Sequence, residues 1–412
     1  MEAPARLAEA PSSMSTAPRT VPVILIAGST ILSASLGIRQ SFGLFLAPVS
    51  ADGGITIGML AFAIAVQNLV WGLAQPFAGA VADTRGAGRV AAAGGVLYAA
   101  GVVLFWADPS PLTALLGLGL MVGVGLGCTG FSVVMGAVGR AVPPAERSRM
   151  LGIASAGGSL GQILVVLMAQ RLIDGAGAGV ALLAVASVAL LAPLAAVGVA
   201  GAPVTDGGPQ VPLGRTVRAA LGHRGFQLLT LGFFVCGLQL AFMGTHLPGF
   251  LATCHLPASL AAGALALIGA FNILGSWGCG QLGQRHRPKS VLAAVYLLRA
   301  VAILAFLALP KTPASVLAFS AAMGLLWLGT VPLTGAVIGQ IFGPQAMGTL
   351  FGICFLSHQV GSFLGAWLGG VVFEATGSYD AMWLVTAAAG VAAALVHLPI
   401  DDRRRLPAAA PA

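Results

Sequence analysis

Arg39 is a single cation in the middle of the first long apolar run of the chain, with no acidic residue beside it. A guanidinium at membrane depth costs about 2.5–3.5 kcal/mol on insertion scales, so it is usually buried against protein or a water-filled cavity. Its planar group has five N–H donors and suits two-point binding of a carboxylate. We therefore expect Arg39 to contact an anionic substrate. The alternative is an arginine satisfied by main-chain carbonyl groups.

Arg299, His246 and His358 are the other Arg and His side chains expected near the middle of a membrane-spanning helix. For Arg299 we favour a structural role on the carbonyl groups of a helix break, with substrate contact as the alternative. Each histidine is expected either to line the substrate pathway or to serve as a hydrogen-bonding residue of the core. Gln239 shares a helix face with His246 by its spacing.

The twelve acidic residues all lie in tails, loops or expected helix ends. Carboxylates are the usual proton relays of pumps and symporters, so this placement argues against a carboxylate-driven drug/proton antiporter. Three kinds of coupling remain: titration of a histidine near pH ~6.5, a proton carried by the substrate acid itself, or anion exchange. Because cations attract anions strongly in a low-dielectric cavity, the expected substrate is an anion.

Two other functional classes were weighed against a transporter. An intramembrane enzyme needs paired aspartates, a metal cluster or a positioned Ser–His pair, and the sequence indicates none of these at mid-membrane. We therefore expect no enzyme, no metal and no cofactor. A receptor that binds a solute without moving it stays open as an alternative.

The composition is that of a membrane protein. The 412 residues are 58% hydrophobic and only 8% charged, whereas soluble domains carry about 25% charged residues. The 58 glycines suit closely packed membrane helices. Five scattered cysteines form neither a disulfide framework nor a metal-ligand spacing. Residues 1–20, rich in Ala, Pro, Ser and Thr, are expected to form a disordered cytoplasmic tail rather than a signal peptide.

Twelve apolar runs are each long enough to cross a bilayer as a helix, which needs about 20 residues. A stretch rich in Gly and Pro, residues 201–224, is expected to be a cytoplasmic linker between the sixth and seventh runs. The sequence therefore predicts an all-α membrane protein with six-helix bundles in residues 21–200 and 225–400 and a cytoplasmic tail in 401–412. The expected spans are about 22–48, 56–82, 89–106, 112–141, 149–173, 179–200, 225–251, 259–283, 290–309, 314–342, 348–373 and 379–399.

The basic residues indicate the orientation of the helices. If the N-terminus is cytoplasmic, sixteen of the twenty Lys and Arg residues fall on the cytoplasmic side, which is a positive-inside pattern. Topology thus explains the net charge of +8, and nucleic-acid binding is not expected. We expect a monomeric, multi-pass protein of the inner membrane, in contact with lipid and with both termini in the cytoplasm.

The two halves repeat each other at an offset of about 200 residues. Gln239 occupies the place of Arg39, and Asn272 occupies that of Asn68 after a shift of four residues. Several glycines and prolines match without a gap. Two parallel six-helix repeats are the architecture of alternating-access transporters, which hold their substrate between the repeats near the bilayer midplane.

Residues 79–89, with the sequence GAVADTRGAGR, follow the second apolar run. An acid at a helix end, followed by a glycine-rich basic turn, can hold two helix ends together by an ion pair that breaks. The pattern resembles the signature of the major facilitator superfamily between helices 2 and 3, where this loop is a conformational latch. The resemblance implies the fold of that superfamily. The matching latch positions are Gly79, Asp83, Arg85, Gly86 and Arg89.

Within that superfamily, the first helix is similar to that of bacterial relatives of the monocarboxylate and oxalate–formate transporters, which carry a cation where Arg39 lies. Monocarboxylate transporters have an Asp and an Arg in helix 8, where this chain has Asn272 and Ser276. The oxalate–formate branch has a lysine near the position of His358. The candidate substrate-binding residues are Arg39, Gln239, His246, Asn272, Arg299 and His358.

These resemblances imply a secondary active transporter for a small organic anion, with a monocarboxylate as the first expectation. Transport would be linked to protons or would proceed by exchange. The alternative is an efflux carrier for neutral or lipophilic compounds, in which Arg39 is structural.

Overall fold

The computed structural model describes residues 21–51, 55, 57–200 and 212–402. All regular structure in these residues is helical, which confirms the expected all-α class. Within the described part of the chain, eleven stretches are long and apolar enough to cross a membrane, and α2 (Ile57–Arg85) is a further long helix of 29 residues. The expected N-terminal tail, most of the expected linker and residues 403–412 lie outside the described residues.

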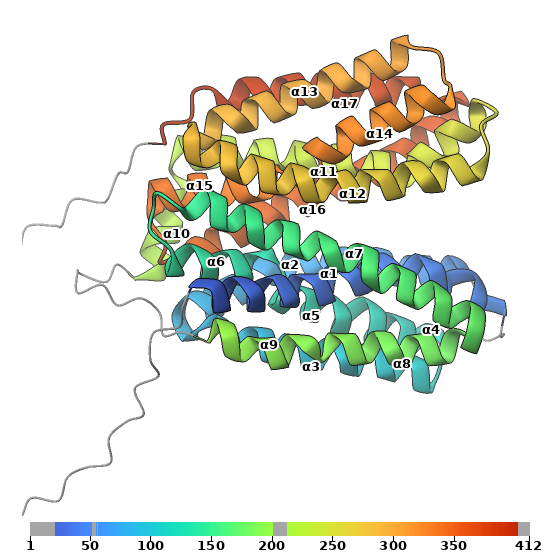
Figure 1. Cartoon of the computed structure of the whole chain (residues 1–412), viewed down its shortest axis with the longest axis horizontal. Helices are drawn as coiled ribbons and strands as arrows, with labels where there is room; N and C mark the ends of the chain where they lie inside the picture. Colours follow the sequence, from blue (N-terminus) through green and yellow to red (C-terminus); the bar gives the residue numbers. More distant parts are fainter. Residues whose placement is uncertain (1–20, 52–54, 56, 201–211, 403–412) are drawn as a thin grey trace, which may run out of the picture.

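The first half of the chain forms one group of helices on one side of the molecule (Figure 1). Two of its stretches consist of consecutive shorter helices, which are α4 to α6 and α8 with α9. Besides α2, the elements are α1 (Val21–Ala51), α3 (Ala87–Ala107), α4 (Pro111–Thr113), the π-helical η1 (Ala114–Met121), α5 (Val122–Thr129), α6 (Phe131–Ala141), α7 (Arg147–Ala176), α8 (Ala178–Ala189) and α9 (Leu191–Val199).

The second half forms the other group, coloured yellow to red in Figure 1. The short α10 precedes its long helices, and α14 and α15 form one interrupted stretch. The elements are α10 (Leu213–Leu221), α11 (Arg224–Thr253), α12 (Ala258–Arg285), α13 (Pro288–Ala308), α14 (Pro313–Leu326), α15 (Thr330–Phe342), α16 (Met347–Thr376) and α17 (Asp380–His397).

Glycines allow the long helices of each half to approach closely. A Cβ atom on Gly161 of α7 would lie 2.0 Å from the main-chain oxygen of Ser33 in α1. In the second half, a Cβ atom on Gly361 of α16 would lie 2.1 Å from the main-chain oxygen of Phe234 in α11. Small residues at helix contacts are typical of membrane proteins, because lipid tails offer no hydrophobic drive for helix association. The predicted repeat pairs the two glycines, Gly161 and Gly361, with each other.

One stretch in each half is broken. In the first half, α5 ends at Thr129 and α6 begins at Phe131, because Gly130 between them is extended (φ −88°, ψ −170°). In the second half, α14 ends at Leu326 and α15 begins at Thr330. A break frees main-chain N–H and C=O groups, which must find partners within the protein because lipid offers none.

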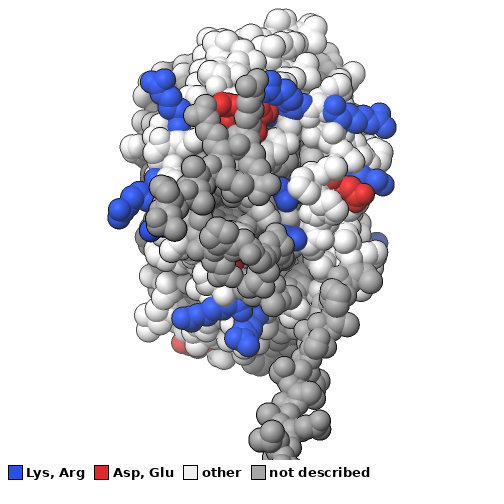
Figure 2. Space-filling view, turned by 90° about the vertical axis from the view of Figure 1, so that its left-hand side faces the viewer, with Lys and Arg blue, Asp and Glu red and all other residues white. Residues whose placement is uncertain are grey.

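Lys and Arg side chains surround one end of the molecule, seen face-on in Figure 2 and at the left of Figure 1. We call it the basic end. Helix α2 finishes there and α3 starts there. The described basic residues that we expected on this side are Arg85, Arg89, Arg140, Arg147, Arg149, Arg215, Arg218, Arg224, Arg285, Arg287 and Lys289.

The last described residues are fastened to the basic end. Arg287 Nε donates to Asp402 Oδ2 at 3.2 Å, and Lys289 Nζ donates to the main-chain oxygen of Leu398 at 2.9 Å. Burial by itself would raise the pKa of Asp402, but the hydrogen bonds and the charge of Arg287 outweigh it and hold that pKa below its ordinary value. The Asp402 carboxylate is therefore ionised at neutral pH.

Candidate functional site

The two halves contact each other at the basic end through glycines. A Cβ atom on Gly79 of α2 would lie 2.4 Å from the main-chain oxygen of Gly348 in α16. A Cβ atom on Gly152 of α7 would lie 2.7 Å from the Cα atom of Gly280 in α12. Beside the first contact, Gly86 turns the chain from α2 into α3 with a φ of 96°, a conformation that favours glycine. A side chain at either contact would separate the halves.

Asp83, near the end of α2, links the halves by charge and hydrogen bonds. Its carboxylate forms an ion pair with Arg140 of α6 in the same half. It also accepts hydrogen bonds from the main-chain nitrogens of Gly348 at 3.2 Å and Thr349 at 2.7 Å, and from Thr349 Oγ1 at 2.8 Å. Gly348 and Thr349 lie in the first turn of α16, where the helix dipole favours a negative charge. The Asp83 side chain is only 1% exposed.

The partner of Asp83 differs from the one that the motif suggests. Arg85 and Arg89 are exposed, and the acid pairs with Arg140. Arg140 and Thr349 are 57 and 266 residues away from Asp83 in the sequence and share no motif with it. Periodicity and spacing therefore carry no signal for these two partners.

Two amide side chains bridge the halves farther from the basic end. Gln359 Nε2 in α16 donates to the main-chain oxygen of Asn68 in α2 at 3.0 Å. Asn272 Nδ2 in α12 donates to Ser159 Oγ in α7 at 3.0 Å. Among the side-chain hydrogen bonds that join the halves in the described residues, these two lie farthest from the basic end.

Beyond these bridges the halves separate. Gly43 lies one helical turn past Arg39 in α1, on the side away from the basic end. Gly269 lies one turn from Asn272 in the same direction along α12. Neither glycine has an atom within 4 Å of the place of a Cβ atom. From these contacts we infer that the halves separate toward the end opposite the basic end. We call the space between them there the cleft, and the two amide bridges are its floor.

Arg39 lies at the floor of the cleft. Its Nη2 and Nε atoms donate to Asn68 Oδ1 at 2.8 and 3.2 Å, and its guanidinium carbon lies 5.0 Å from the centre of the Trp71 ring. The side chain is partly exposed. Among the described residues, no carboxylate pairs with it and its Nη1 atom has no hydrogen-bond partner. Arg39 thus presents a positive charge and free N–H donors at the bottom of the cleft.

Arg299 is fully buried inside the second half and does not reach the cleft. Its Nε donates to the main-chain oxygen of Leu326 at 3.0 Å, and its Nη2 bonds to that of Trp327. These oxygens belong to the break between α14 and α15, so the guanidinium satisfies the groups that the break frees. The structural role favoured from the sequence agrees with this geometry, whereas the candidate substrate contact does not.

Gln239 is also turned away from the cleft and is completely buried. Its Oε1 accepts from Arg299 Nη1 at 3.3 Å, and its Nε2 donates to the main-chain oxygen of Thr386 in α17 at 3.0 Å. The residue that replaces Arg39 in the repeat therefore supports Arg299 within the second half. In this structure it is not part of a substrate surface, because both of its polar atoms are engaged.

The two candidate histidines differ in their surroundings. His246 Nε2 donates to the main-chain oxygen of Ala366 at 2.7 Å, which joins α11 to α16 within the second half. His358 is 9% exposed, and its Nδ1 donates to Gln359 Oε1 at 3.2 Å. Since Gln359 bridges the halves, His358 is connected to the floor of the cleft and His246 is not.

Asn272 bonds both to the floor of the cleft and to the break between α14 and α15. Besides the bond to Ser159, its Oδ1 accepts from the main-chain nitrogen of Leu328 at 2.9 Å and from Ser276 Oγ at 3.3 Å. All its polar atoms are thereby engaged. The amide that replaces the helix 8 acid of the monocarboxylate family holds the halves and the break together.

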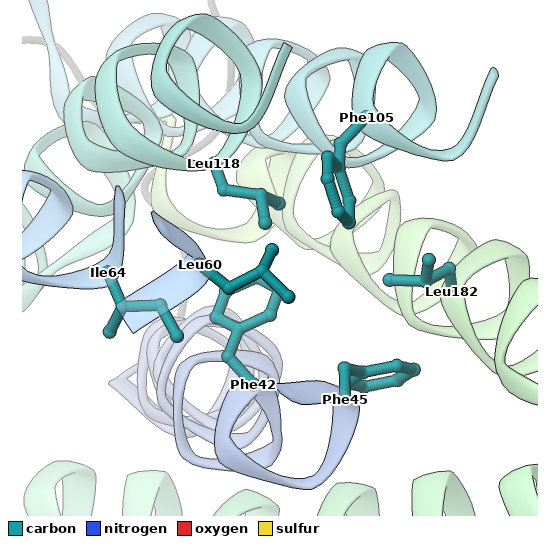
Figure 3. Close-up of a pocket in the computed structure, with 7 residues that line it drawn as sticks. All are labelled: Phe42, Phe45, Leu60, Ile64, Phe105, Leu118 and Leu182. Atoms are coloured by element: carbon teal, nitrogen blue, oxygen red, sulfur yellow. The ribbon is translucent and has the colours of Figure 1, made fainter. Parts of the chain in front are cut away.

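An apolar pocket lies within the first half, beside α1 (Figure 3). All seven lining side chains are hydrocarbon, so the pocket offers no polar partner to a charged solute. They come from α1, α2, α3, η1 and α8. They are Phe42, Phe45, Leu60, Ile64, Phe105, Leu118 and Leu182.

Comparison with known families and proteins gives a consistent picture. The family model described as the Major Facilitator Superfamily matches residues 23–325 and 273–411. The uncharacterized MFS-type transporter YcxA of Bacillus subtilis is 24% identical over 417 residues, which cover 95% of this chain and 98% of that protein. Monocarboxylate transporter 11 of Mus musculus is 28% identical over 413 residues, covering 93% of this chain and 88% of that protein.

Solved structures of the fucose:proton symporter FucP of E. coli share the fold. One is superposed with a TM-score of 0.71 over 92% of this chain and 98% of that chain, at 18% identity. Another, described as being in the outward conformation, has a TM-score of 0.72 over 91% of this chain and 97% of that chain, also at 18% identity. At this identity the similarity concerns the fold alone.

Proposed function

The chain belongs to the major facilitator superfamily and is a secondary transporter; on that premise we propose that it moves a small organic anion, with monocarboxylates as the first class of substrate. The observation that carries the proposal is Arg39, a cation at the floor of the cleft that no carboxylate neutralises in the described residues. Relatives named as monocarboxylate transporters, at 24–28% identity, agree with this substrate class.

The electrostatics of the floor favour an anion over a cation or a neutral solute. Arg39 is fixed by Asn68 and Trp71, and neither partner is charged. A carboxylate that accepts hydrogen bonds from the guanidinium gains both Coulomb energy and charge-assisted bonds, and both are stronger away from bulk water. A cation would be repelled, and a neutral solute would accept hydrogen bonds from the guanidinium without the Coulomb energy of an opposite charge. The anion is therefore the solute that this floor binds best.

In the proposed transport cycle, the protein is closed alternately at the basic end and at the opposite end. In this structure the basic end is closed by Asp83 and the glycine contacts, while the cleft opens at the opposite end. The positive-inside rule makes the basic end cytoplasmic, so this arrangement is the outward-open one. Release into the cytoplasm then requires the bonds of Asp83 to Thr349 and the Gln359 bridge to break. We place the protein in the inner membrane as a monomer, with its transport linked to protons or proceeding by exchange.

The test is uptake of radiolabelled lactate and pyruvate by proteoliposomes that contain the purified protein. Wild type should accumulate label above empty vesicles, and Arg39→Ala should lower uptake to that background. Arg171→Ala is the matched control, because Arg171 is an exposed arginine near the other end of the molecule. An Arg39→Ala protein that takes up the anions as well as wild type does would overturn the assignment.

A further inference from the structure

Three buried donors lie at the break between α5 and α6, one to two helical turns closer to the basic end than Arg39. Trp71 is 4% exposed, and Gln75 and Ser132 are 0% exposed. Trp71 Nε1, Gln75 Nε2 and Ser132 Oγ have no hydrogen-bond partner among the described residues. Leaving a buried polar group unpaired costs about 1–3 kcal/mol, so three together call for a functional explanation.

The amide of Gln75 has a defined orientation. Its Oε1 accepts from the main-chain nitrogen of Ser132 at 3.2 Å, in the first turn of the 11-residue helix α6. Its Nε2 must therefore point away from that nitrogen, because a flipped amide would set one donor against another. At Gly130, the place of a Cβ atom is 2.5 Å from Gln75 Nε2 and 3.2 Å from Trp71 Nε1. The two side-chain nitrogens thus converge on the break beside the positive end of α6.

In the corresponding break of the second half, main-chain groups that the break frees have side-chain partners in the described residues. Arg299 holds its free carbonyl oxygens, and Asn272 Oδ1 accepts from the main-chain nitrogen of Leu328. A buried hydroxyl without a partner, Thr334 Oγ1, also lies one turn into α15. At Gly130 the main-chain oxygen of Leu126 lies 2.6 Å from the same Cβ position, so two side-chain nitrogens without partners and one acceptor lie around this point. Such an excess of donors suits an anion.

Helix α16 covers this site in the present structure. The Trp71 ring contacts both Arg39, whose guanidinium carbon lies 5.0 Å from the ring centre, and the Phe355 ring of α16, at 4.8 Å between centroids. One turn farther along α16, a Cβ atom on Gly352 would lie 2.7 Å from the main chain of Gln75. If α16 moves away when the basic end opens, Phe355 leaves Trp71 and the donors of Trp71 and Gln75 face the opened side.

We propose that Trp71 Nε1 and Gln75 Nε2, at the positive end of α6, form a second binding position for the carboxylate of an organic anion. This inference rests on the proposed function. Arg39 receives the carboxylate from the cleft, and Trp71 and Gln75 receive it after α16 has withdrawn, before release at the basic end. The Trp71 ring is shared between the two positions, because one face contacts Arg39 while its N–H points to the break. The second position therefore determines how tightly the protein binds an organic anion that enters from the basic side.

The experiment compares KM for lactate and pyruvate from the two sides. Intact cells report the side opposite the basic end, and inverted membrane vesicles report the basic side. Trp71→Phe keeps an aromatic ring but removes the N–H, and should raise the basic-side KM about three- to tenfold, as expected for one lost hydrogen bond. Gln75→Glu keeps the acceptor for Ser132 and adds a negative charge, so its basic-side KM should rise further. In Gln75→Glu the KM from the opposite side should change less than about twofold. In Trp71→Phe the readout is the ratio of the two KM values, which should rise, because the Trp71 ring also contacts Arg39.

Gln67→Leu is the matched control. It removes a buried amide from the same helix, but that amide donates to the main-chain oxygen of Leu118 inside the first half. Both of its KM values should stay near those of wild type. If Trp71→Phe and Gln75→Glu leave the basic-side KM unchanged, or raise both KM values equally, the second position is refuted while the role of Arg39 stands. If wild type transports neither anion, the proposed function fails and this inference fails with it.

Discussion

Gln359 Nε2 donates to the main-chain oxygen of Asn68 at 3.0 Å, so a side chain of the second half is bonded to the residue that holds Arg39 in the first. The same amide accepts from His358 through its Oε1. Asn68 therefore takes part in both contacts: its side chain holds Arg39, which faces the cleft, and its main-chain oxygen accepts the bond from Gln359 that closes the floor. An anion that draws Arg39 away from Asn68 acts directly on the junction between the halves.

Gln359→Leu should open the basic end more often. The substitution removes one neutral hydrogen bond between the halves, which contributes about 1 kcal/mol, so the equilibrium should shift about fivefold. The measurement is the rate at which an impermeant maleimide labels a cysteine placed at Gly43, which has open space around it in the cleft. Labelling should slow, because the cleft is open for a smaller fraction of the time. Cys254, a partly exposed cysteine, is replaced by serine in the background.

The control for this prediction is Gln67→Leu in the same background, which should label at the parent rate because its amide lies within one half. Unchanged or faster labelling of the Gln359→Leu protein would show that the bridge does not hold the basic end closed.

Asp83→Asn should weaken the same closure more strongly. The amide keeps only one acceptor oxygen for the first turn of α16, and Arg140, whose side chain is 8% exposed, loses its counter-charge. Breaking a buried ion pair costs about 3–5 kcal/mol, so melting temperature and maleimide labelling in the cleft should both fall. Adding Arg140→Gln should restore part of the melting temperature, because the uncompensated charge is gone.

Asp402→Asn is the comparison for Asp83→Asn. Its partner Arg287 is 58% exposed, so water screens the pair strongly, although the Asp402 side chain itself is 6% exposed. Because the pKa of Asp402 is held below its ordinary value, the stabilisation by the pair is fully present above that ordinary pKa and is lost as the pH falls through the lowered pKa. At pH 7 the substitution should change the melting temperature little. An equal loss for Asp402→Asn and Asp83→Asn would contradict the proposed role of Asp83.

Arg299→Lys should lower the stability of the protein, whereas Arg39→Lys should weaken its binding of anions. A lysine at 299 cannot reach the break carbonyls and Gln239 together, since its single ammonium lacks the fork of the guanidinium. We expect a loss of about 3 kcal/mol in stability. Arg39→Lys should leave the melting temperature nearly unchanged and weaken the binding of anions. Dye-based melting curves without substrate, followed by titration with pyruvate, separate the two effects. A stable Arg299→Lys protein would refute the structural role.

The fold could be predicted from the sequence because its signals are local or periodic. The apolar runs predicted the all-α membrane class, and the motif of residues 79–89 indicated the superfamily, which the family match confirms. Arg39 stood out for a similar reason, since a charge within an apolar run is visible without coordinates. The repeat gave equivalent positions in the two halves but not equivalent surroundings.

The surroundings of these side chains depend on contacts between distant segments, which the spacing of residues in the sequence does not indicate. Gln239 matches Arg39 in the repeat, yet it packs against Arg299 because the guanidinium needs an acceptor beside the broken helix. Nothing in the sequence distinguishes Trp71 from the other tryptophans, and only its contacts with Arg39 and Phe355 make it distinctive. Such relationships arise from helix packing between distant segments, so they had to be read from the structure.

Asn68→Asp should inhibit transport without harming the fold. In wild type, Arg39 donates two hydrogen bonds to a neutral amide oxygen, which leaves its charge available to a solute. A carboxylate at the same place would form an ion pair with Arg39, and a substrate anion would have to displace it. We expect KM for pyruvate to rise at least about tenfold, which corresponds to about 1.4 kcal/mol, while the melting temperature stays the same or rises. Asn68→Ser removes the amide oxygen and adds no charge, so it should raise KM less. If Asn68→Asp transports pyruvate with the KM of wild type, Arg39 does not bind the anion, because a neutralised guanidinium could not attract it.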